Sequence, residues 1–339
     1  MADASTLKIK TDDGIDNKYG KLDKSLVALL KNYEVEYFRE DKPVPFCGLK
    51  IYPIQVRNYE EFSNCCSCLT LNKNETMEGV RMSHLDFLVS KMQSKEDAGE
   101  GWSYKVQRLF ELIFHIDNGM KCTDCGHVVK YTDREFIEFV QKMKTLQMQV
   151  QEQGEESLDP SQLPELVCPK CKKNHFTEMI KLKQDEKTKR YSMIVDGKTI
   201  TKNDYANLRQ IVLFQNYPDY ADDSWVDPDI KRDYQARMEI ERRNNDVHAS
   251  IEKKVTCLSI TTNYKFDEIY DMSIRRFTMA LATVDDLINY KIMRQAVMSG
   301  FVSLPKGKKI EHWIYKPDKD MYGDSYKDAE ELKSSVNNL

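Results

Sequence analysis

The sequence predicts an α+β fold, mainly helical, into which a small module built around four cysteines is inserted. Several long segments repeat apolar residues at three- and four-residue intervals, which is the spacing of amphipathic helices. Shorter segments alternate polar and apolar residues, as half-buried strands do. Two C-x-x-C motifs, at 122–125 and 168–171, interrupt the helical pattern. Helices are therefore expected to supply most of the core, and the cysteines to organise a separate insertion.

The first third of the chain is predicted to combine helices with a strand. Apolar spacing favours a helix over 22–37, and alternation favours a strand over 48–54. A second helix is expected from about Tyr59. Ser83 is a suitable N-cap for a third helix, and the apolar-periodic segment 102–115 is expected to form a fourth.

The cysteine region contains elements of its own. A helix is predicted over 133–150, between the two motifs, because its apolar residues share one face. Beyond the second motif, the segments 176–183 and 191–201 have the pattern of strands. The Asp196-Gly197 pair inside the second of these is typical of a hairpin turn.

The last part of the chain is predicted to be helical. A helix over 203–215 is followed by an acidic loop over 217–229. The segment 228–246 is helix-forming but polar on nearly every side, which is typical of a solvated strut. The strongest helical pattern runs from 273 to 298, and Gly300 is expected to end that helix.

The two C-x-x-C motifs are the strongest functional signal. Zinc prefers four thiolates in a tetrahedron, and each short turn presents two sulfur atoms on one side of a tight loop. Cys122, Cys125, Cys168 and Cys171 are therefore predicted to bind one structural Zn²⁺ ion, which makes the insertion a zinc ribbon with four cysteine ligands. The 42 residues between Cys125 and Cys168 exceed the spacing of a compact ribbon, and the predicted inserted helix accounts for the excess.

Other interpretations of these cysteines are weaker. Two well-formed turns flanked by Gly126 and Pro169 argue against four unrelated buried thiols. A thioredoxin-like redox pair is a weaker rival, because neither motif lies between a clear strand and helix of a βαβ unit. A catalytic zinc would need an open coordination position, which four thiolates do not leave. His127 and His175 lie near the motifs and could replace a thiolate, but each is more simply a surface residue or a neighbour of the ligands.

These elements divide the chain into five predicted parts. They are a flexible arm (1–20), an N-terminal mixed α/β region (21–120), the zinc ribbon with its inserted helix and β-hairpin (121–202), a C-terminal helical module (203–319) and a polar tail (320–339).

Composition and charge argue against several classes of protein. The 51 basic and 55 acidic side chains give a formal charge of -4, and residues 121–190 contain 13 basic against 12 acidic side chains. Neither balance provides the positive surface that binds phosphates, so no nucleic-acid partner is expected. The sequence has no signal peptide and no run of roughly 18–20 apolar residues, so a cytoplasmic protein without membrane contact is expected. Nine cysteines in that compartment indicate thiols or metal ligands.

The remaining clusters have simpler interpretations. Cys65, Cys66 and Cys68 are expected to be small buried thiols, and Cys257 to lie in the core. The acidic loop is interpreted as solvated or as a docking surface for a basic partner. The histidines stand in no catalytic motif and no phosphate-binding glycine loop is present, so neither enzymatic activity nor a small-molecule substrate is expected.

Three passages of the sequence carry a resemblance to a known family. The first is GLKIYPIQVRNYEEF (48–62), continued by CLTLNKN (68–74) and SHLDF (83–87). The second is VCPKC (167–171), and the third is IYDMSIRRF (269–277), continued by YKIMRQAVMSGF (290–301) and HW (312–313). Together they resemble the baseplate hub and hub-assembly proteins of contractile-tailed bacteriophages, including members with a zinc-ribbon insertion. The predicted helices at 133–150 and 228–246 depart from that family pattern.

The resemblance implies a non-enzymatic tail protein, either a structural component of the baseplate hub or a factor that assembles it. Its partners would be other tail and baseplate proteins and further copies of itself. Its location would be the host cytoplasm during assembly and then the virion tail. Two rival functions stay open, namely an intracellular zinc-ribbon regulator that binds nucleic acid, and a metal-dependent hydrolase that uses Asp222, Asp223 and Asp227.

Overall fold

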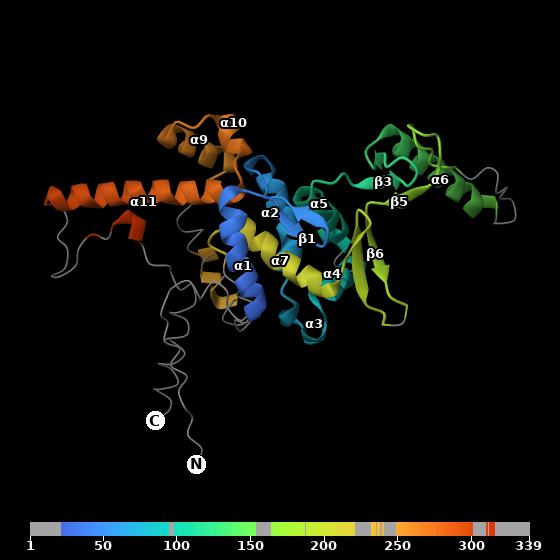
Figure 1. The fold of residues 1–339 in the computed structure, drawn as a ribbon, viewed down its shortest axis with the longest axis horizontal. Coiled ribbons are helices and arrows are strands. Elements are labelled where there is room, and N and C mark those ends of the chain that lie inside the picture. Colours follow the sequence, from blue (N-terminus) through green and yellow to red (C-terminus); the bar gives the residue numbers. More distant parts are fainter. Residues whose placement is uncertain are drawn as a thin grey trace, which may run out of the picture.

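The arrangement of the chain is known for most of its length. The computed structural model describes residues 22–94, 98–153, 164–186, 188–220, 232–234, 236–237, 239–240, 249–300, 310 and 312–315. The fold is α+β and mainly helical, as the sequence predicts. Figure 1 shows a central group of helices, with the cysteine module (119–178) at one end and the long helix α11 (Ile274–Met298) extending from the other.

The central core is formed by helices and a short hairpin that pack their apolar side chains together. The α-helices are α1 (Lys24–Glu36), α2 (Tyr59–Thr70), α3 (Met77–Arg81), α4 (His84–Gln93), α5 (Trp102–Phe114) and α7 (Lys202–Asn216), and the hairpin strands are β1 (Val44–Phe46) and β2 (Leu49–Ile51). Single 3-10 turns lie at Phe38–Glu40, Val56–Asn58, Lys73–Glu75 and Ala98–Glu100.

Helix α7 lies within this core. It begins at a capping box formed by Thr201 and Asp204, and most of its side chains are buried. Asn216, at its end, accepts a hydrogen bond from the backbone N–H of Ile54 at 2.9 Å. This bond ties α7 to the segment that follows β2.

The chain forms two antiparallel three-stranded sheets, the first within the cysteine module and the second packed on the core. Their strand orders are β4-β3-β5 and β6-β7-β8. The strands are β3 (Gly119–Cys122), β4 (Val128–Lys130), β5 (Phe176–Glu178), β6 (Ile180–Gln184), β7 (Tyr191–Val195) and β8 (Lys198–Ile200). Met179 alone separates β5 from β6, and it donates to Gly119 O at 3.0 Å and accepts from Asp196 N at 2.8 Å. The two sheets are therefore joined at one residue.

Several predicted elements of this region are confirmed. The inserted helix is α6 (Arg134–Gln153), between the two cysteine motifs. Asp196 and Gly197 form the turn between β7 and β8, and both have positive φ values, 45° and 73°, as a type I′ hairpin turn requires. Gly119 is required for another reason, because a Cβ at this position would lie 2.2 Å from the carbonyl oxygen of Val129.

The C-terminal helices form a smaller cluster beside the core. α9 (Ile251–Thr262), α10 (Phe266–Asp271) and the start of α11 bury Val255, Leu258, Ile269 and Phe277 together with Val56. The chain continues to a 3-10 turn at Trp313–Tyr315, which contacts α11. As predicted, α11 ends before Gly300, whose φ is +78°.

The C-terminal cluster is attached to the core through backbone and side-chain bonds. The N–H of Val56 donates to Met272 O at 2.9 Å, and the N–H of Ile274 donates to Ile54 O at 2.7 Å. The side chain of Arg275 then crosses into the core and donates to the carbonyl oxygen at the end of α7. The projecting part of α11 begins directly after this attachment (Figure 1).

Some predicted segments lie outside the described residues. They include the arm at 1–20, the tail at 320–339 and the acidic loop beyond residue 220, with Asp222, Asp223 and Asp227. In the predicted polar helix 228–246, the described residues 232–234, 236–237 and 239–240 are helical. The division into five parts stays a prediction. Its boundary at 203 groups α7 with the C-terminal helices, whereas the buried side chains of α7 pack in the central core.

Among the described helices, none combines the length and apolar character that crossing a membrane requires.

Candidate metal centre

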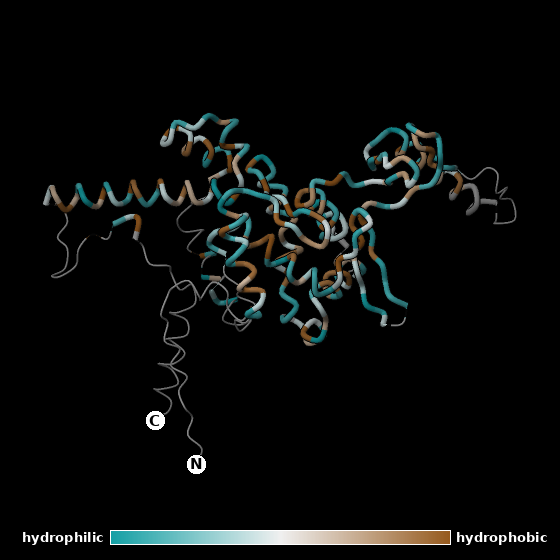
Figure 2. Tube along the Cα trace, in the orientation of Figure 1, coloured by the Kyte–Doolittle hydropathy of each residue, from teal (hydrophilic) through white to brown (hydrophobic). Residues whose placement is uncertain are grey.

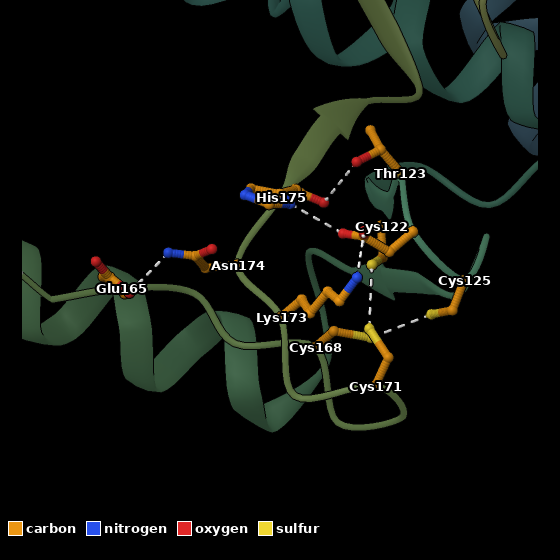
Figure 3. A network of polar contacts seen from close by, with 10 residues as sticks. Cys122, Thr123, Cys125, Glu165, Cys168, Cys171, Lys173, Asn174 and His175 are labelled. Atoms are coloured by element: carbon orange, nitrogen blue, oxygen red, sulfur yellow. Dashed lines mark hydrogen bonds and ion pairs between the residues drawn. The ribbon is translucent and has the colours of Figure 1, made fainter.

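The structure brings the four predicted ligands together at the end of the first sheet. Cys122 is the last residue of β3 and Cys125 lies in the turn that follows, while Cys168 and Cys171 lie in the loop before β5. Their sulfur atoms all lie within 4.8 Å of one another. Figure 3 shows the four side chains pointing toward one centre.

The sulfur spacing fits a tetrahedral ion. Cys122 Sγ lies 3.5 Å from Cys171 Sγ, and Cys125 Sγ lies 3.6 Å from Cys168 Sγ. Four sulfur atoms at the usual zinc–sulfur distance of about 2.3 Å would be about 3.8 Å apart. Among the described residues, this cluster is the one group of three or more His, Cys, Asp or Glu side chains that could hold a metal ion. It is compatible with a zinc ribbon.

The two motifs fold into the same turn. In the first, the N–H of Cys122 donates to His127 O at 2.8 Å, and the N–H of Gly126 donates to Cys122 O at 2.9 Å. In the second, Cys168 N–H donates to Lys173 O at 2.8 Å, and Lys172 N–H donates to Cys168 O at 2.9 Å. Backbone hydrogen bonds therefore form at equivalent positions in both turns.

Burial, backbone hydrogen bonds and neighbouring thiols shift the pKa values of three of the four thiols. Burial opposes ionisation of Cys168, but hydrogen bonds from the backbone N–H groups of Cys171 and Lys170 lower its pKa to about 6. At Cys125 and Cys171, backbone hydrogen bonds favour the thiolates, yet burial and the neighbouring thiols raise both pKa values, that of Cys171 to about 12. A cation bound between the sulfur atoms would offset the repulsion between neighbouring thiolates.

A polar clamp outside the sulfur cluster links the two turns. Asp124, in the first turn, accepts from Lys173 Nζ at 2.7 Å and lies 3.0 Å from His175 Nδ1. The Lys173 ammonium holds the pKa of Asp124 below its usual value, with a further contribution from His175. The N–H of Thr123 also donates to His175 O at 3.0 Å. The Thr123 hydroxyl donates to the same oxygen at 3.4 Å (Figure 3). His175 therefore lies beside the cluster and faces Asp124 rather than replacing a thiolate.

Apolar contacts place α6 on the module. Tyr131 packs against Phe136 in the first turn of α6, with ring centroids 4.7 Å apart. Val129 and Leu166 are buried beneath the turns. Ile137, Met143 and Met148 remain exposed along α6, so this helix offers apolar surface away from the core.

The other cysteines lie elsewhere. Cys65, Cys66 and Cys68 are buried in α2, as predicted, and burial raises the pKa of Cys65 and Cys66 to about 11 each. These thiols are therefore protonated at neutral pH and poor metal ligands. The prediction for Cys257 is wrong: it is exposed, because α9 turns Val255 and Leu258 toward the cluster instead.

The residue after each motif provides a test of the turn geometry. Gly126 and Lys172 occupy equivalent left-handed positions, with φ of 72° and 61°. We expect Gly126→Ala to destabilise the metal-bound module by about 1 kcal/mol, because an alanine is strained in the left-handed conformation. A Cβ at this position would meet no atom within 4 Å, so no steric clash adds to that cost. Lys172→Gly relieves the same strain, so it should cost less than about 0.5 kcal/mol or stabilise. Chelator-induced unfolding of both variants measures this difference in stability. If the two variants lost the same amount of stability, the equivalence of the two turns would be contradicted.

The sequence indicates the four cysteines as candidate metal ligands, but it does not indicate the pair of Asp124 and Lys173 beside them. Asp124 and Lys173 are 49 positions apart, and a Lys or His near a cysteine motif is too common to indicate a specific pair. The signal that could have suggested this pair is the opposite charge of the two turns, with Asp124 in the first and Lys173 in the second.

Comparison with known proteins bears on a different part of the chain. A family model described as the YomV second domain matches residues 242–318, which include α9, α10, α11 and the turn at Trp313–Tyr315. YomV is a phage-derived protein family. No curated protein and no solved structure matches the chain. The C-terminal helices are thus similar to a domain of a phage-derived family, and the cysteine module lies outside the matched residues.

Proposed function

We propose that Cys122, Cys125, Cys168 and Cys171 bind one Zn²⁺ ion with a structural role. The choice of zinc rests on the donor set, because four thiolates at tetrahedral spacing suit this ion. With four protein ligands the coordination shell is closed, so the ion has no position for a water or substrate. The ion instead cross-links two stretches of backbone that are more than 40 residues apart in the chain.

We further propose that the chain is a non-enzymatic tail protein of a phage, either a structural component of the baseplate hub or a factor in its assembly. The observation that carries this proposal is the match of residues 242–318 to a phage-derived family. The resemblance of three sequence passages to baseplate hub proteins supports the finer assignment. The layout is suitable for assembly, because the cysteine module and α11 project from opposite ends of the core and can contact different neighbours (Figure 1).

Tagging the protein in an infected host tests this proposal. Antibody labelling of purified particles and of tail intermediates should place the tag at the end of the tail that carries the baseplate, or on intermediates alone if the protein acts in assembly. A matched pair of variants adds a functional readout: Cys168→Ser should lower the yield of complete tails, whereas Cys257→Ser, at an exposed thiol, should not. Label found on neither tails nor intermediates would contradict the proposal.

The rival function, a regulator that binds nucleic acid, predicts a different binding behaviour. Binding through phosphate contacts weakens steeply as salt is added, by about 10³–10⁵ between 50 and 200 mM for 6–10 contacts. We expect the purified protein to show no such salt-dependent binding to DNA or RNA. Tight binding that is lost over this range of salt would favour the regulator and count against a tail protein.

A further inference from the structure

A Zn²⁺ ion would neutralise only part of the charge of four thiolates. Two net negative charges remain on such a site, so positive charge near the sulfur atoms stabilises the bound form. Backbone N–H groups supply part of this stabilisation, since those of Lys170 and Cys171 bond to the sulfur of Cys168. These groups are dipoles without net charge. A side-chain cation beside the sulfur atoms would therefore add what the backbone lacks.

Lys173 is held beside the cluster by its own backbone. Its carbonyl oxygen accepts from the N–H of Cys168 at 2.8 Å, and its N–H bonds to the sulfur of Cys171. The side chain then reaches Asp124, whose carboxylate lies 2.7 Å from the ammonium (Figure 3). Asp124 raises the pKa of Lys173 most, and the thiolates of Cys171 and Cys122 raise it further. The ammonium is therefore close enough to two of the ligands to interact with their charge.

The simpler interpretation is that Lys173 and Asp124 form an ordinary surface ion pair. The Lys173 side chain is 57% exposed, and pairs at such positions contribute little to stability. Two observations point to a further role. The ammonium interacts with two ligands as well as with the carboxylate. Asp124 also lies between the cysteines of the first motif, so the pair joins the two halves of the site.

We propose that the ammonium of Lys173 offsets the negative charge of the metal-bound sulfur atoms and so increases the affinity of the site for zinc. This inference rests on the proposed zinc site and adds to it a residue that acts through the ligands without binding the ion. Asp124 orients the lysine, but its own negative charge lies near that of the thiolates. The two effects of Asp124 therefore oppose each other, and the gain in affinity comes from the lysine.

The zinc affinity of full-length variants tests this role. Competition with a coloured zinc chelator, at neutral pH and low salt, measures the dissociation constant. Lys173→Met keeps the aliphatic chain and removes the charge, so it should raise the dissociation constant about tenfold. Each variant should still bind one zinc ion, which shows that the module folds. An unchanged dissociation constant in Lys173→Met would overturn the proposal.

Two lysine variants serve as controls. Lys173→Arg keeps the charge, so it should change the dissociation constant less than about threefold. Lys170→Met removes the same charge from an exposed position in the same turn, and it should also change the constant less than about threefold. A tenfold rise in either control would mean that the charge of Lys173 has no special role.

Two further measurements separate the charge of Lys173 from its ion pair. Asp124→Asn breaks the pair but leaves the ammonium near the thiolates, so it should raise the dissociation constant less than Lys173→Met does. An equal rise would assign the effect to the link between the turns and overturn the electrostatic role. Salt at 1 M shortens the Debye length to about 3 Å, so the effect of Lys173→Met should shrink to about threefold or less. An effect that salt leaves unchanged would also contradict it.

The unsubstituted protein separates this inference from the proposed function. If it bound no zinc, the proposed site itself would be wrong. If it binds one zinc ion per chain and Lys173→Met binds zinc equally well, the site stands and only the role of Lys173 is lost.

Discussion

Replacing Cys168 with serine is expected to unfold the cysteine module and to leave the helical core folded. A structural zinc site contributes on the order of 10 kcal/mol or more to local folding, because the ligands come together only in the folded state. The loss of one thiolate removes most of that contribution. The core should survive because its buried apolar side chains come mainly from α1, α2, α4, α5 and α7, which lie outside the module.

Limited proteolysis followed by mass spectrometry measures this outcome. We expect rapid cleavage between residues 119 and 178 in the Cys168→Ser variant, with fragments of the core persisting. Removal of zinc from the unsubstituted protein by a strong chelator should reproduce the cleavage pattern, and acidification should do so as well, because thiolates must be deprotonated to bind the metal. Cys257→Ser is the control, since this thiol is exposed and distant from the cluster in sequence. Unchanged resistance of residues 119–178 would contradict a metal-dependent module.

Arg275→Ala is expected to have the second largest effect, a loss of about 3 kcal/mol in the free energy of unfolding. The Arg275 side chain is 9% exposed and crosses from α11 into the core. It donates to Phe214 O at 2.8 Å and to Glu34 Oε1 at 3.1 Å, and its guanidinium lies 5.8 Å from the centre of the Phe38 ring. Removing it deletes the hydrogen bonds that the guanidinium donates to a buried carbonyl and to a partly buried carboxylate.

The neighbouring arginine supplies the control for this prediction. Arg276 pairs with Asp41 at 2.8 Å, but its side chain is 55% exposed. Exposed pairs contribute little, so Arg276→Ala should cost less than about 1 kcal/mol. Urea unfolding of the two variants measures the difference between their stability losses. Hydrogen exchange of residues 251–277 provides a local readout of the same difference. Equal losses from the two substitutions would mean that Arg275 does not anchor the C-terminal cluster to the core.

Local signals allowed the long helices and the clustering of the four cysteines to be predicted from sequence. α11 was expected over 273–298 and is found at Ile274–Met298, because Ser273 caps its first turn and Gly300 ends it. Both signals act within a few residues. The four cysteines were equally predictable, since two short turns that each present a pair of thiolates have one common use.

Long-range packing could not be predicted in the same way. α7 buries polar residues such as Arg209 and Gln215 together with its apolar ones, so the polar pattern of its sequence does not show which elements it contacts. The prediction therefore groups it with the C-terminal helices instead of the core. The bonds of Arg275 span 61 and 241 positions, and no local pattern indicates such partners. Cys257 was assigned to the core from its apolar neighbours, although the packed face of α9 is set by Val255 and Leu258.

The central claim is that four cysteine sulfurs surround a single metal ion and join two distant parts of the backbone. X-ray absorption at the zinc edge, combined with metal analysis of the purified protein, measures this directly. We expect one zinc per chain, with four sulfur neighbours at about 2.3 Å. A protein that holds no stoichiometric metal, or a zinc ion surrounded by nitrogen and oxygen at about 2.0–2.1 Å, would contradict it.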